Sequence, residues 1–232
     1  MKSFFTALAI FFWVATVQAG DQFDPLPLAT GAAWAYDAKV KFALNGKDRE
    51  KTLTWTTEIN TVVVRNKIVI ARGKGLPSDL AMYDNSVKPA PFLFVKINPW
   101  RLYVIHDQGR IDEVWNKATK PDEGLFGIVT EADLLLDFPL LEGKAYGETE
   151  QITRSDASYV YVVEGKKQLA ASAIKGLPAS RSSDEFSISF RTRPDLTTWK
   201  FTPGVGFTGY HYSHHGTTGE ADCHLTEYRP GN

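Results

Sequence analysis

The stretch Thr198-Trp199-Lys200-Phe201-Thr202-Pro203-Gly204-Val205-Gly206-Phe207 decides the fold of this 232-residue chain. Its aromatic run meets a Pro-Gly-x-Gly break, and a second run of alternating apolar and polar residues continues to His215. After the turn signal Gly216-Thr217-Thr218-Gly219, the alternation resumes from Glu220 to Tyr228. Alternation with a period of two, interrupted by Gly and Pro, is typical of antiparallel β-hairpins. The carboxyl-terminal part is therefore predicted to be β-structure.

The same pattern continues upstream of this stretch. From Trp34 to Leu44 apolar and polar residues alternate, and the run stops at Asn45-Gly46, the strongest short signal for a β-hairpin turn. Further strand-like runs are 51–64, 68–70, 91–95, 102–106, 159–163, 169–174 and 186–190. Together these hairpins predict an all-β fold, a large curved antiparallel sheet or open half-barrel of about ten to twelve strands.

Three segments receive more specific predictions. Thr130-Glu131-Ala132-Asp133 has a helix N-cap with an acid at the third helical position, and Pro139 would end the helix, so one short helix is expected near 130–137. Ile111, Val114 and Trp115 are expected to lie on a strand that pairs with 102–106. The charged segment 117–123 is expected to be an exposed connection between halves.

The first nineteen residues are typical of a secretory signal. They contain the basic Lys2, an apolar stretch from Phe4 to Val14 and the small-x-small cleavage pattern Val17-Gln18-Ala19. The mature chain is therefore expected to be a single β domain of residues 20–232. No Cys lies directly after the apolar stretch, where a lipid anchor would be attached. No later run approaches the ~20 apolar residues of a membrane-spanning helix. The sequence predicts an exported, soluble protein, periplasmic or extracellular, without a lipid anchor or transmembrane segment.

Charge and cysteine content exclude some classes of protein. Lys and Arg number 26 against 27 Asp and Glu, and removing Lys2 with the signal leaves 25 against 27, a net charge of −2. Since nucleic-acid binders usually carry a concentrated basic surface, we expect no nucleic-acid partner. Cys223 is the single cysteine, so no intramolecular disulfide can form. Its place among apolar neighbours predicts a buried, unreactive thiol.

Two short strings occur twice in the chain. Pro139-Leu140-Leu141-Glu142-Gly143 is similar to Pro27-Leu28-Ala29-Thr30-Gly31, and Lys74-Gly75-Leu76-Pro77 is repeated as Lys175-Gly176-Leu177-Pro178. One interpretation is that the domain consists of two related halves, with lobes 25–116 and 138–230. The other is chance, because short Pro/Gly strings recur in turn-rich β proteins.

Three motifs carry a resemblance to a known group. They are a PLxxGxxWxY opening at Pro27 to Tyr36, a Gly-Leu-Pro-Ala turn at Gly176 to Ala179 and a WxxxPGVG hairpin at Trp199 to Gly206. In these motifs the chain resembles exported bacterial proteins of unknown function that look like periplasmic lipoprotein-carrier half-barrels. The resemblance implies a curved antiparallel sheet that partly encloses an apolar trough. It implies no catalytic residue.

The last hairpin gathers candidate metal ligands. With Thr217 and Thr218 as the two turn residues, His211 would lie opposite His224, and alternation would put one polar set on a single face. The candidate ligands in this set are His211, His215, Glu220, Asp222 and His224. Imidazoles and carboxylates suit zinc, the one cofactor that the sequence suggests. The stronger interpretation is the solvated face of a half-buried strand, so no cofactor is expected.

Recognisable enzyme motifs are absent from the sequence. There is no G-x-S-x-G, H-E-x-x-H, P-loop or G-x-G-x-x-G motif. We therefore expect no catalytic residue and rank a hydrolase without a recognisable motif as the third functional hypothesis.

The aromatic side chains suggest the first functional hypothesis, binding of an apolar ligand. Most must pack in the core, but a strongly curved sheet with little helix has limited cover for its concave face. That face could hold a lipid-like or other apolar ligand. The candidate ligand-binding residues are Trp34, Tyr36, Trp55, Phe94, Trp199 and Phe201. The second hypothesis is a structural or interaction module that offers a sheet edge or the polar hairpin to a protein of the cell envelope.

Overall fold

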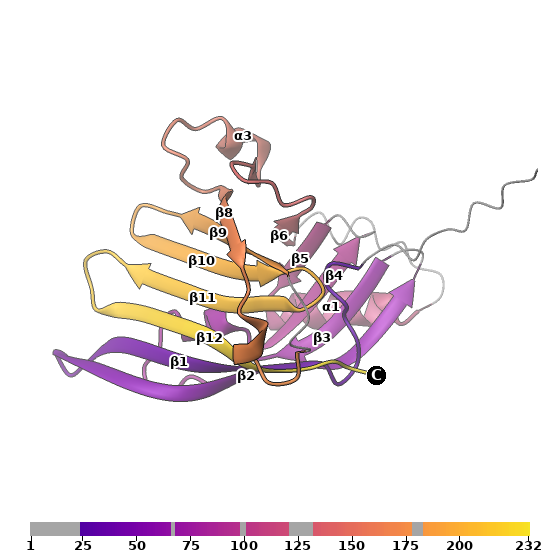
Figure 1. Ribbon diagram of the computed structural model, residues 1–232, viewed down its shortest axis with the longest axis horizontal. Helices are drawn as coiled ribbons and strands as arrows, with labels where there is room; N and C mark the ends of the chain where they lie inside the picture. The colour runs from indigo at the N-terminus through magenta and orange to yellow at the C-terminus, as the bar shows by residue number, and fades with distance from the viewer. Residues whose placement is uncertain (1–23, 66–67, 98–100, 121–131, 178–182) are drawn as a thin grey trace, which may run out of the picture.

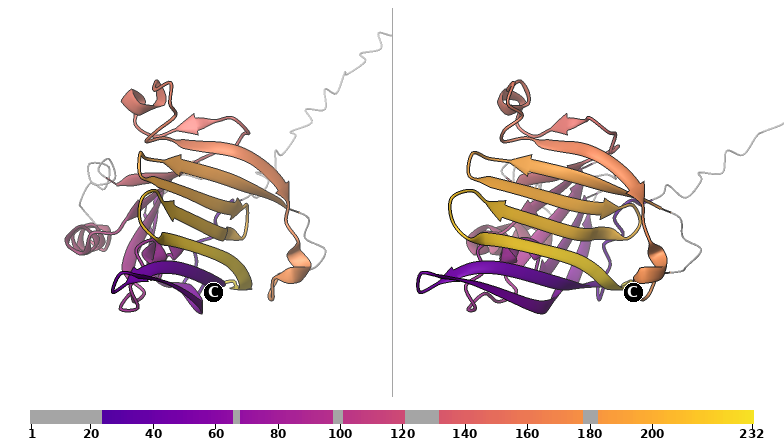
Figure 2. Two further views of the ribbon diagram at one scale, coloured as in Figure 1. Left: turned by 90° about the vertical axis from the view of Figure 1, so that its left-hand side faces the viewer. Right: turned by 60° about the vertical axis from the view of Figure 1, so that its left-hand side comes forward.

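A computed structural model describes residues 24–65, 68–97, 101–120, 132–177 and 183–232. In these ranges a 12-stranded antiparallel sheet curls into a nearly closed barrel (Figures 1 and 2). The predicted fold class is therefore confirmed. The predicted signal peptide, 1–19, lies outside the described residues.

The barrel consists of two meanders joined by the first and last strands. The first meander comprises β1 (Ala33–Leu44), β2 (Lys47–Arg65), β3 (Ile68–Lys74), β4 (Pro91–Ile97), β5 (Arg101–Ile105) and β6 (Asp133–Asp137). The second comprises β7 (Ala145–Tyr146), β8 (Tyr161–Gln168), β9 (Asp184–Arg191), β10 (Asp195–Thr202), β11 (Gly206–His214) and β12 (Gly219–Arg229). Because β1 pairs with β12, the spatial order is β6-β5-β4-β3-β2-β1-β12-β11-β10-β9-β8-β7.

The two edge strands, β6 and β7, meet at a seam that side chains close. Tyr146 Oη donates a hydrogen bond of 3.0 Å to the Leu135 carbonyl. Lys144 Nζ lies 3.3 Å from a carboxylate oxygen of Asp137. The rings of Phe138 and Phe201 pack edge to face, with centroids 5.5 Å apart. No backbone ladder joins β6 to β7 among the described residues.

Among the described residues, the longest helix is α1 (Gln108–Ala118), which covers the convex face of β3 and β4. Its buried residues Ile111, Val114 and Ala118 pack on outward-facing side chains of the sheet and form a second, smaller core. The Asp107 side chain caps the helix by accepting a hydrogen bond of 2.9 Å from the Arg110 N–H. Shorter helical turns are η1 (Pro77–Leu80), α3 (Thr149–Ile152) and η3 (Ala171–Ala173).

Two of these segment predictions are wrong, and so is the strand expected at 169–174, where the chain has left β8 and forms the short turn η3 (Ala171–Ala173). The residues expected to form a strand at 111–115 lie in α1, where the spacing of Ile111, Val114 and Ala118 makes one apolar helix face. The helix expected near 130–137 is replaced over Asp133–Asp137 by β6, while 130–131 lie outside the described residues. Pairing with β5 satisfies the backbone there and buries Leu135 and Leu136, which outweighs the local capping signal.

The main core fills the barrel and draws on both meanders. Buried side chains from Leu26 to Tyr228 form one continuous hydrophobic cluster. Within it, Phe207 lies 6.0 Å from Phe94 and 4.9 Å from Trp199, measured between ring centroids. The two proposed lobes therefore share a single interior.

The chain's opening segment contacts the turn between β10 and β11 directly. Trp34 Nε1 donates a hydrogen bond of 2.7 Å to the Val205 carbonyl, and Tyr36 Oη donates one of 2.9 Å to the Phe207 carbonyl. The Gly204 N–H donates to the Pro25 carbonyl at 2.6 Å. Thus two sequence motifs that are far apart in the chain form one packed unit.

One of the two repeated strings occupies equivalent places in the meanders. Gly31 and Gly143 both have positive φ, 84° and 81°. Each donates a backbone hydrogen bond to the second strand of its own meander, to Ile59 at 2.9 Å and to Val163 at 2.8 Å. The Lys-Gly-Leu-Pro strings are not equivalent, since one follows β3 and the other follows β8. Duplication of the chain stays a prediction.

Replacing Gly206 by Ala is expected to destabilise the protein more than replacing Gly216 by Ala. Both glycines have positive φ, 110° and 103°, so either Ala costs about 1 to 2 kcal/mol of backbone strain. At Gly206 an added Cβ would also lie 3.1 Å from Trp34 Nε1, whereas at Gly216 nothing lies within 4 Å. Urea unfolding should show a further loss of about 1 to 2 kcal/mol for Gly206→Ala. Equal losses would contradict the close contact between this turn and Trp34.

Candidate functional site

A cavity of about 160 Å³ lies on the concave side of the sheet, beside the seam. Its walls come from β5 and β6 on one side of the seam and from β8 to β11 on the other, with η1 and its preceding residue at one end. The lining residues are Leu76, Ser78, Val104, His106, Asp133, Leu135, Tyr161, Phe190, Thr197, Trp199 and Tyr210. The cavity thus exists only where the two edges of the curled sheet approach each other.

Aromatic pairs form one wall of the cavity. Trp199 and Tyr210 are direct cross-strand partners on β10 and β11, with ring centroids 4.6 Å apart. Tyr161 and Phe190 are partners on β8 and β9, with centroids 4.7 Å apart. Strand alternation points all four rings to the concave face, where such pairs stabilise the sheet and offer flat apolar surfaces.

Polar groups interrupt this apolar lining. Ser78 Oγ is buried and has no hydrogen-bond partner among the described residues. Desolvation by surrounding protein lowers the pKa of His106, against the opposing influence of the Asp133 carboxylate, so its imidazole is neutral at pH 7. Burial, with a smaller contribution from Asp133, raises the pKa of Tyr161 to about 12. The cavity therefore presents uncharged donors and acceptors together with one carboxylate.

The six aromatic residues predicted to bind ligand are all buried, and one of them lines this cavity. That residue is Trp199. Trp34 and Tyr36 use their polar atoms to hold the turn between β10 and β11, and Trp55 Nε1 donates to the Gly75 carbonyl at 3.0 Å. The other two, Phe94 and Phe201, belong to the continuous core.

Most of the cavity's residues could not be found from the sequence. Ser78, His106 and Asp133 come from three separate segments with no shared spacing or motif. The one usable signal was the alternation of aromatic residues along 159–163 and 186–190, which put Tyr161 and Phe190 on strands. Their meeting with β6 depends on the closure of the barrel.

The terminal hairpin has a different register from the one expected. His211 lies opposite Asp222, not His224, because a loop of four residues, His215 to Thr218, separates β11 from β12 in place of a two-residue turn. A shift by two residues keeps every side chain on its predicted face. Accordingly Tyr210 and Cys223 are buried.

The candidate metal ligands lie on the convex face. Asp222 lies between two imidazoles, with one oxygen 3.1 Å from His224 Nε2 and the other 3.9 Å from His211 Nδ1. Glu220 is engaged by Lys41 at 2.6 Å, and His215 is exposed in the loop. Within the described ranges no three His, Cys, Asp or Glu side chains are grouped to hold a metal ion. Zinc binding by this set stays a prediction.

A further polar cluster, absent from the sequence predictions, lies where β10 begins and β11 ends. Asp195 Oδ1 accepts a hydrogen bond of 2.7 Å from Tyr212 Oη and lies 2.7 Å from His214 Nδ1. Burial acts to raise the pKa of Asp195, but hydrogen bonds from His214, Tyr212 and Thr192 together lower it. Burial, with Asp195, raises the pKa of Tyr212 to about 12. The cluster ties the strand ends together.

The predicted burial of Cys223 is confirmed. The residue is 1% exposed, and burial, with the charge of Asp222, raises the pKa of its thiol to about 12. Since the thiolate is the nucleophile, this thiol is unreactive at neutral pH.

Comparison with solved structures finds matches of low identity. A predicted exported protein with a YmcC-like fold from Bacteroides fragilis matches 90% of this chain and 100% of its own, with 6% identity and a TM-score of 0.43. A predicted lipoprotein from Parabacteroides distasonis matches the same shares, with 8% identity and a TM-score of 0.37. No protein-family profile and no curated protein matches the chain.

Over the parts of the chain that the structure describes, no helix is both long enough and apolar enough to cross a bilayer.

Beside the cavity, Asp79 is expected to make stability depend on pH. Burial raises its pKa from 3.8 to about 6, although the Ala90 N–H donates to it at 2.9 Å. The folded state therefore binds the proton of Asp79 more tightly than the unfolded state does. The resulting contribution to the free energy of unfolding is fully present below about pH 3.8 and is lost as the pH rises through about 6. Asp79→Asn should therefore raise the free energy of unfolding at pH 7.5 by about 1 to 2 kcal/mol, allowing for partial exposure, and change it little at pH 4.

The matched control is Asp84→Asn, measured by the same urea unfolding series. Hydrogen bonds from the Ser86 hydroxyl and N–H lower the pKa of Asp84, so its substitution should reduce stability at pH 7.5 instead. If both substitutions, or neither, stabilised the protein at pH 7.5, burial of the Asp79 carboxyl would not be the cause of the pH dependence of stability.

Proposed function

We propose that this protein is an exported, non-catalytic binding protein that holds a lipid-like or other apolar ligand on the concave face of its barrel. The observation that carries the proposal is the cavity of about 160 Å³ at the seam, with its aromatic wall. The unpartnered hydroxyl of Ser78 supports it, since buried polar groups normally have a partner and a ligand could supply one.

The size of the cavity limits what it can enclose. An apolar cavity of about 150 Å³ accommodates a benzene molecule. The cavity in its observed form therefore suits one ring or a short alkyl segment with a polar end. A longer acyl chain would have to pass between β6 and β7. The seam is the weakest part of the barrel wall, because side-chain contacts of Tyr146, Lys144 and Phe138 close it without a strand ladder.

A second candidate function is that of an interaction module of the cell envelope. Three exposed apolar side chains favour it, Leu141 (59% exposed), Ile152 (42%) and Tyr159 (39%). All three lie in the segment that carries β7 and α3, beside the edge of the second meander (Figure 1). Native mass spectrometry of protein purified from its own host distinguishes the two. A co-purifying lipid-like molecule supports the binding protein, and a ligand-free chain bound to another protein supports the module.

Substitution of Val104 by Phe is expected to weaken ligand binding. Val104 is 4% exposed and lines the cavity, so the added ring would occupy much of its volume. Titration with phenol, a single ring with a polar end that matches the size of the cavity, followed by backbone amide NMR shifts, should show an affinity at least tenfold lower than that of the unsubstituted protein.

The control is Val64→Phe, the same change at a position that is 67% exposed. It should leave probe affinity unchanged. Thermal unfolding of both variants checks that the barrel is intact. Equal probe affinity in a folded Val104→Phe variant would overturn the assignment of the cavity.

A further inference from the structure

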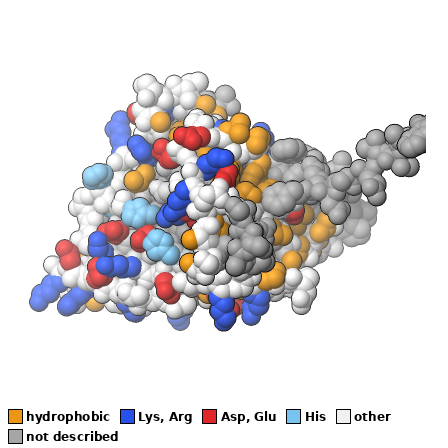
Figure 3. Space-filling model, in the orientation of Figure 1, with side chains coloured by type: hydrophobic (Ala, Val, Ile, Leu, Met, Phe, Trp, Pro, Cys, Tyr) orange, Lys and Arg blue, Asp and Glu red, His pale blue; other side chains and the backbone are white. Residues whose placement is uncertain are grey.

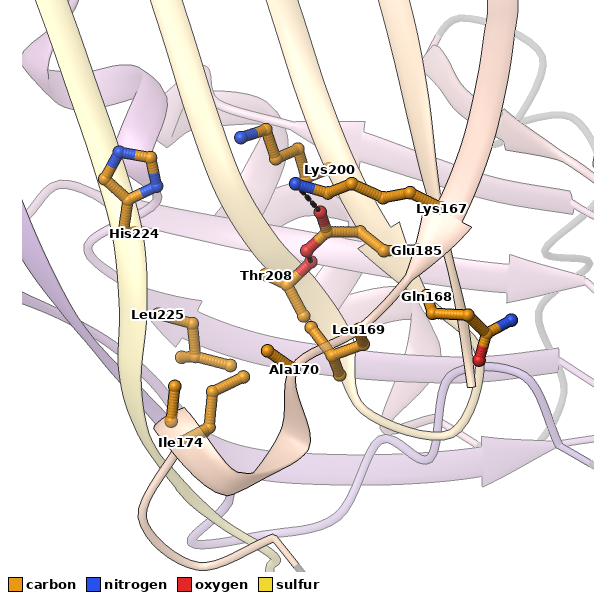
Figure 4. A pocket seen from close by; sticks show the side chains of 11 residues that line it. Lys167, Gln168, Leu169, Ala170, Ile174, Glu185, Lys200, Thr208, His224 and Leu225 are labelled. Atoms are coloured by element: carbon orange, nitrogen blue, oxygen red, sulfur yellow. Dashed lines mark hydrogen bonds and ion pairs between the residues drawn. The ribbon is translucent and has the colours of Figure 1, made fainter. Parts of the chain in front are cut away.

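A second pocket, of about 200 Å³, lies on the convex face, on the opposite side of the sheet from the cavity (Figure 4). It is covered by a strap, defined as residues 168–177, which leaves β8 and crosses the outside of the sheet to β12 (Figure 1). The Lys175 N–H donates to the Thr226 carbonyl at 2.9 Å, and the Tyr228 N–H donates to the Lys175 carbonyl at 2.8 Å. These bonds hold the far end of the strap in place.

One part of the pocket contains a buried carboxylate whose two oxygens are both occupied. Glu185 is 4% exposed. Thr208 Oγ1 donates a hydrogen bond of 2.7 Å to one of its oxygens, and Lys167 Nζ lies 3.2 Å from the other. The charge of Glu185 is therefore balanced by Lys167, and neither group is left to attract a ligand ion.

Lys200, unlike Lys167, has no acidic partner among the described residues of the pocket. Its side chain extends between Lys167 and His224 (Figure 4), and no hydrogen bond or ion pair joins it to another described residue. Its stem lies over Gly209, where an added Cβ would be 3.1 Å from Lys200 Cδ. The absence of a side chain at Gly209 thus leaves room for Lys200 to lie along the sheet. The pocket carries one positive charge that no acidic side chain of the described ranges balances.

The remaining wall of the pocket is apolar. Leu225 and Ile174 are buried, and Leu169 packs against the core beside them. Ala170 and Ala173 of the strap complete this side. Figure 3, in the same orientation as Figure 1, shows basic, acidic and histidine side chains together on this face of the molecule. An apolar wall next to one unbalanced ammonium group is a combination that suits an amphipathic anion.

We propose that this pocket binds a small organic carboxylate, with its charged group at Lys200 and its aliphatic part against Leu225 and Ile174. A monoanion balances the single ammonium charge, whereas a doubly charged phosphate would leave one negative charge unbalanced in the pocket. Scaled from the benzene-sized cavity, the volume holds about six to ten non-hydrogen atoms. The site is separate from the cavity inside the barrel and does not depend on the function proposed for it.

Titration of the full mature chain with hexanoate tests the proposal, with hexylammonium as the probe of opposite charge. Backbone amide NMR shifts are expected to change at Lys200, Thr208 and Leu225 with hexanoate and not with hexylammonium. Lys200→Met keeps the stem and removes the charge, so hexanoate should bind at least tenfold more weakly. Lys39→Met is the control, because Lys39 pairs with Glu50 on the same convex face and lies outside the pocket.

A second pair of variants blocks the pocket without touching its charges. Ala173 lines the pocket, and its neighbour Ser172 in η3 does not. Ala173→Trp should abolish the hexanoate shifts, and Ser172→Trp should preserve them. Equal binding of the two probes, or hexanoate binding unchanged in both Lys200→Met and Ala173→Trp, would overturn the proposal. Binding of phenol in the cavity inside the barrel should be unaffected in all four variants, so the test of each site is independent of the other.

Discussion

The hydrogen bond from Trp34 Nε1 to the Val205 carbonyl, 2.7 Å long, connects the start of the barrel to its last hairpins. Trp34 lies at the beginning of β1, which pairs with β12 and so joins the two meanders. Both groups of the bond are buried, where an unpaired polar atom costs about 1 to 3 kcal/mol. Gly206 has no side chain and leaves the space that the indole ring occupies. If this contact failed, the junction between the meanders would lose its packing.

The curl of the sheet that follows from this junction brings β6 and β7 together without joining their backbones. A fully hydrogen-bonded barrel of this width would have no weak line in its wall. Here Tyr146 and Lys144 bridge the gap with side chains, and the cavity lies beside it. The approach of β6 and β7 without backbone pairing therefore explains both where the proposed ligand site lies and where the barrel wall is weakest.

The two faces of a single strand separate the two proposed sites. On β10, Trp199 points into the barrel and lines the cavity, while Lys200 points outward into the pocket beneath the strap. Strand alternation makes consecutive residues face opposite sides of the sheet. One strand can thus supply an aromatic surface to an apolar ligand and a charge to an anion, with the sheet as a barrier between them.

The sequence by itself determined the β class, the hairpin at Asn45-Gly46 and the faces of the last hairpin, because alternation and turn chemistry are local properties. Local signals failed at Asp133–Asp137, where an N-cap pattern predicted helix and pairing with β5 produced a strand. The register of the last hairpin also escaped prediction, since it depends on a loop length that turn residues do not specify. Only the tertiary structure decided which residues line the cavity and the outer pocket. Ser78, Asp133 and Tyr161 meet because the sheet curls until its edges touch, and no spacing along the chain encodes that contact.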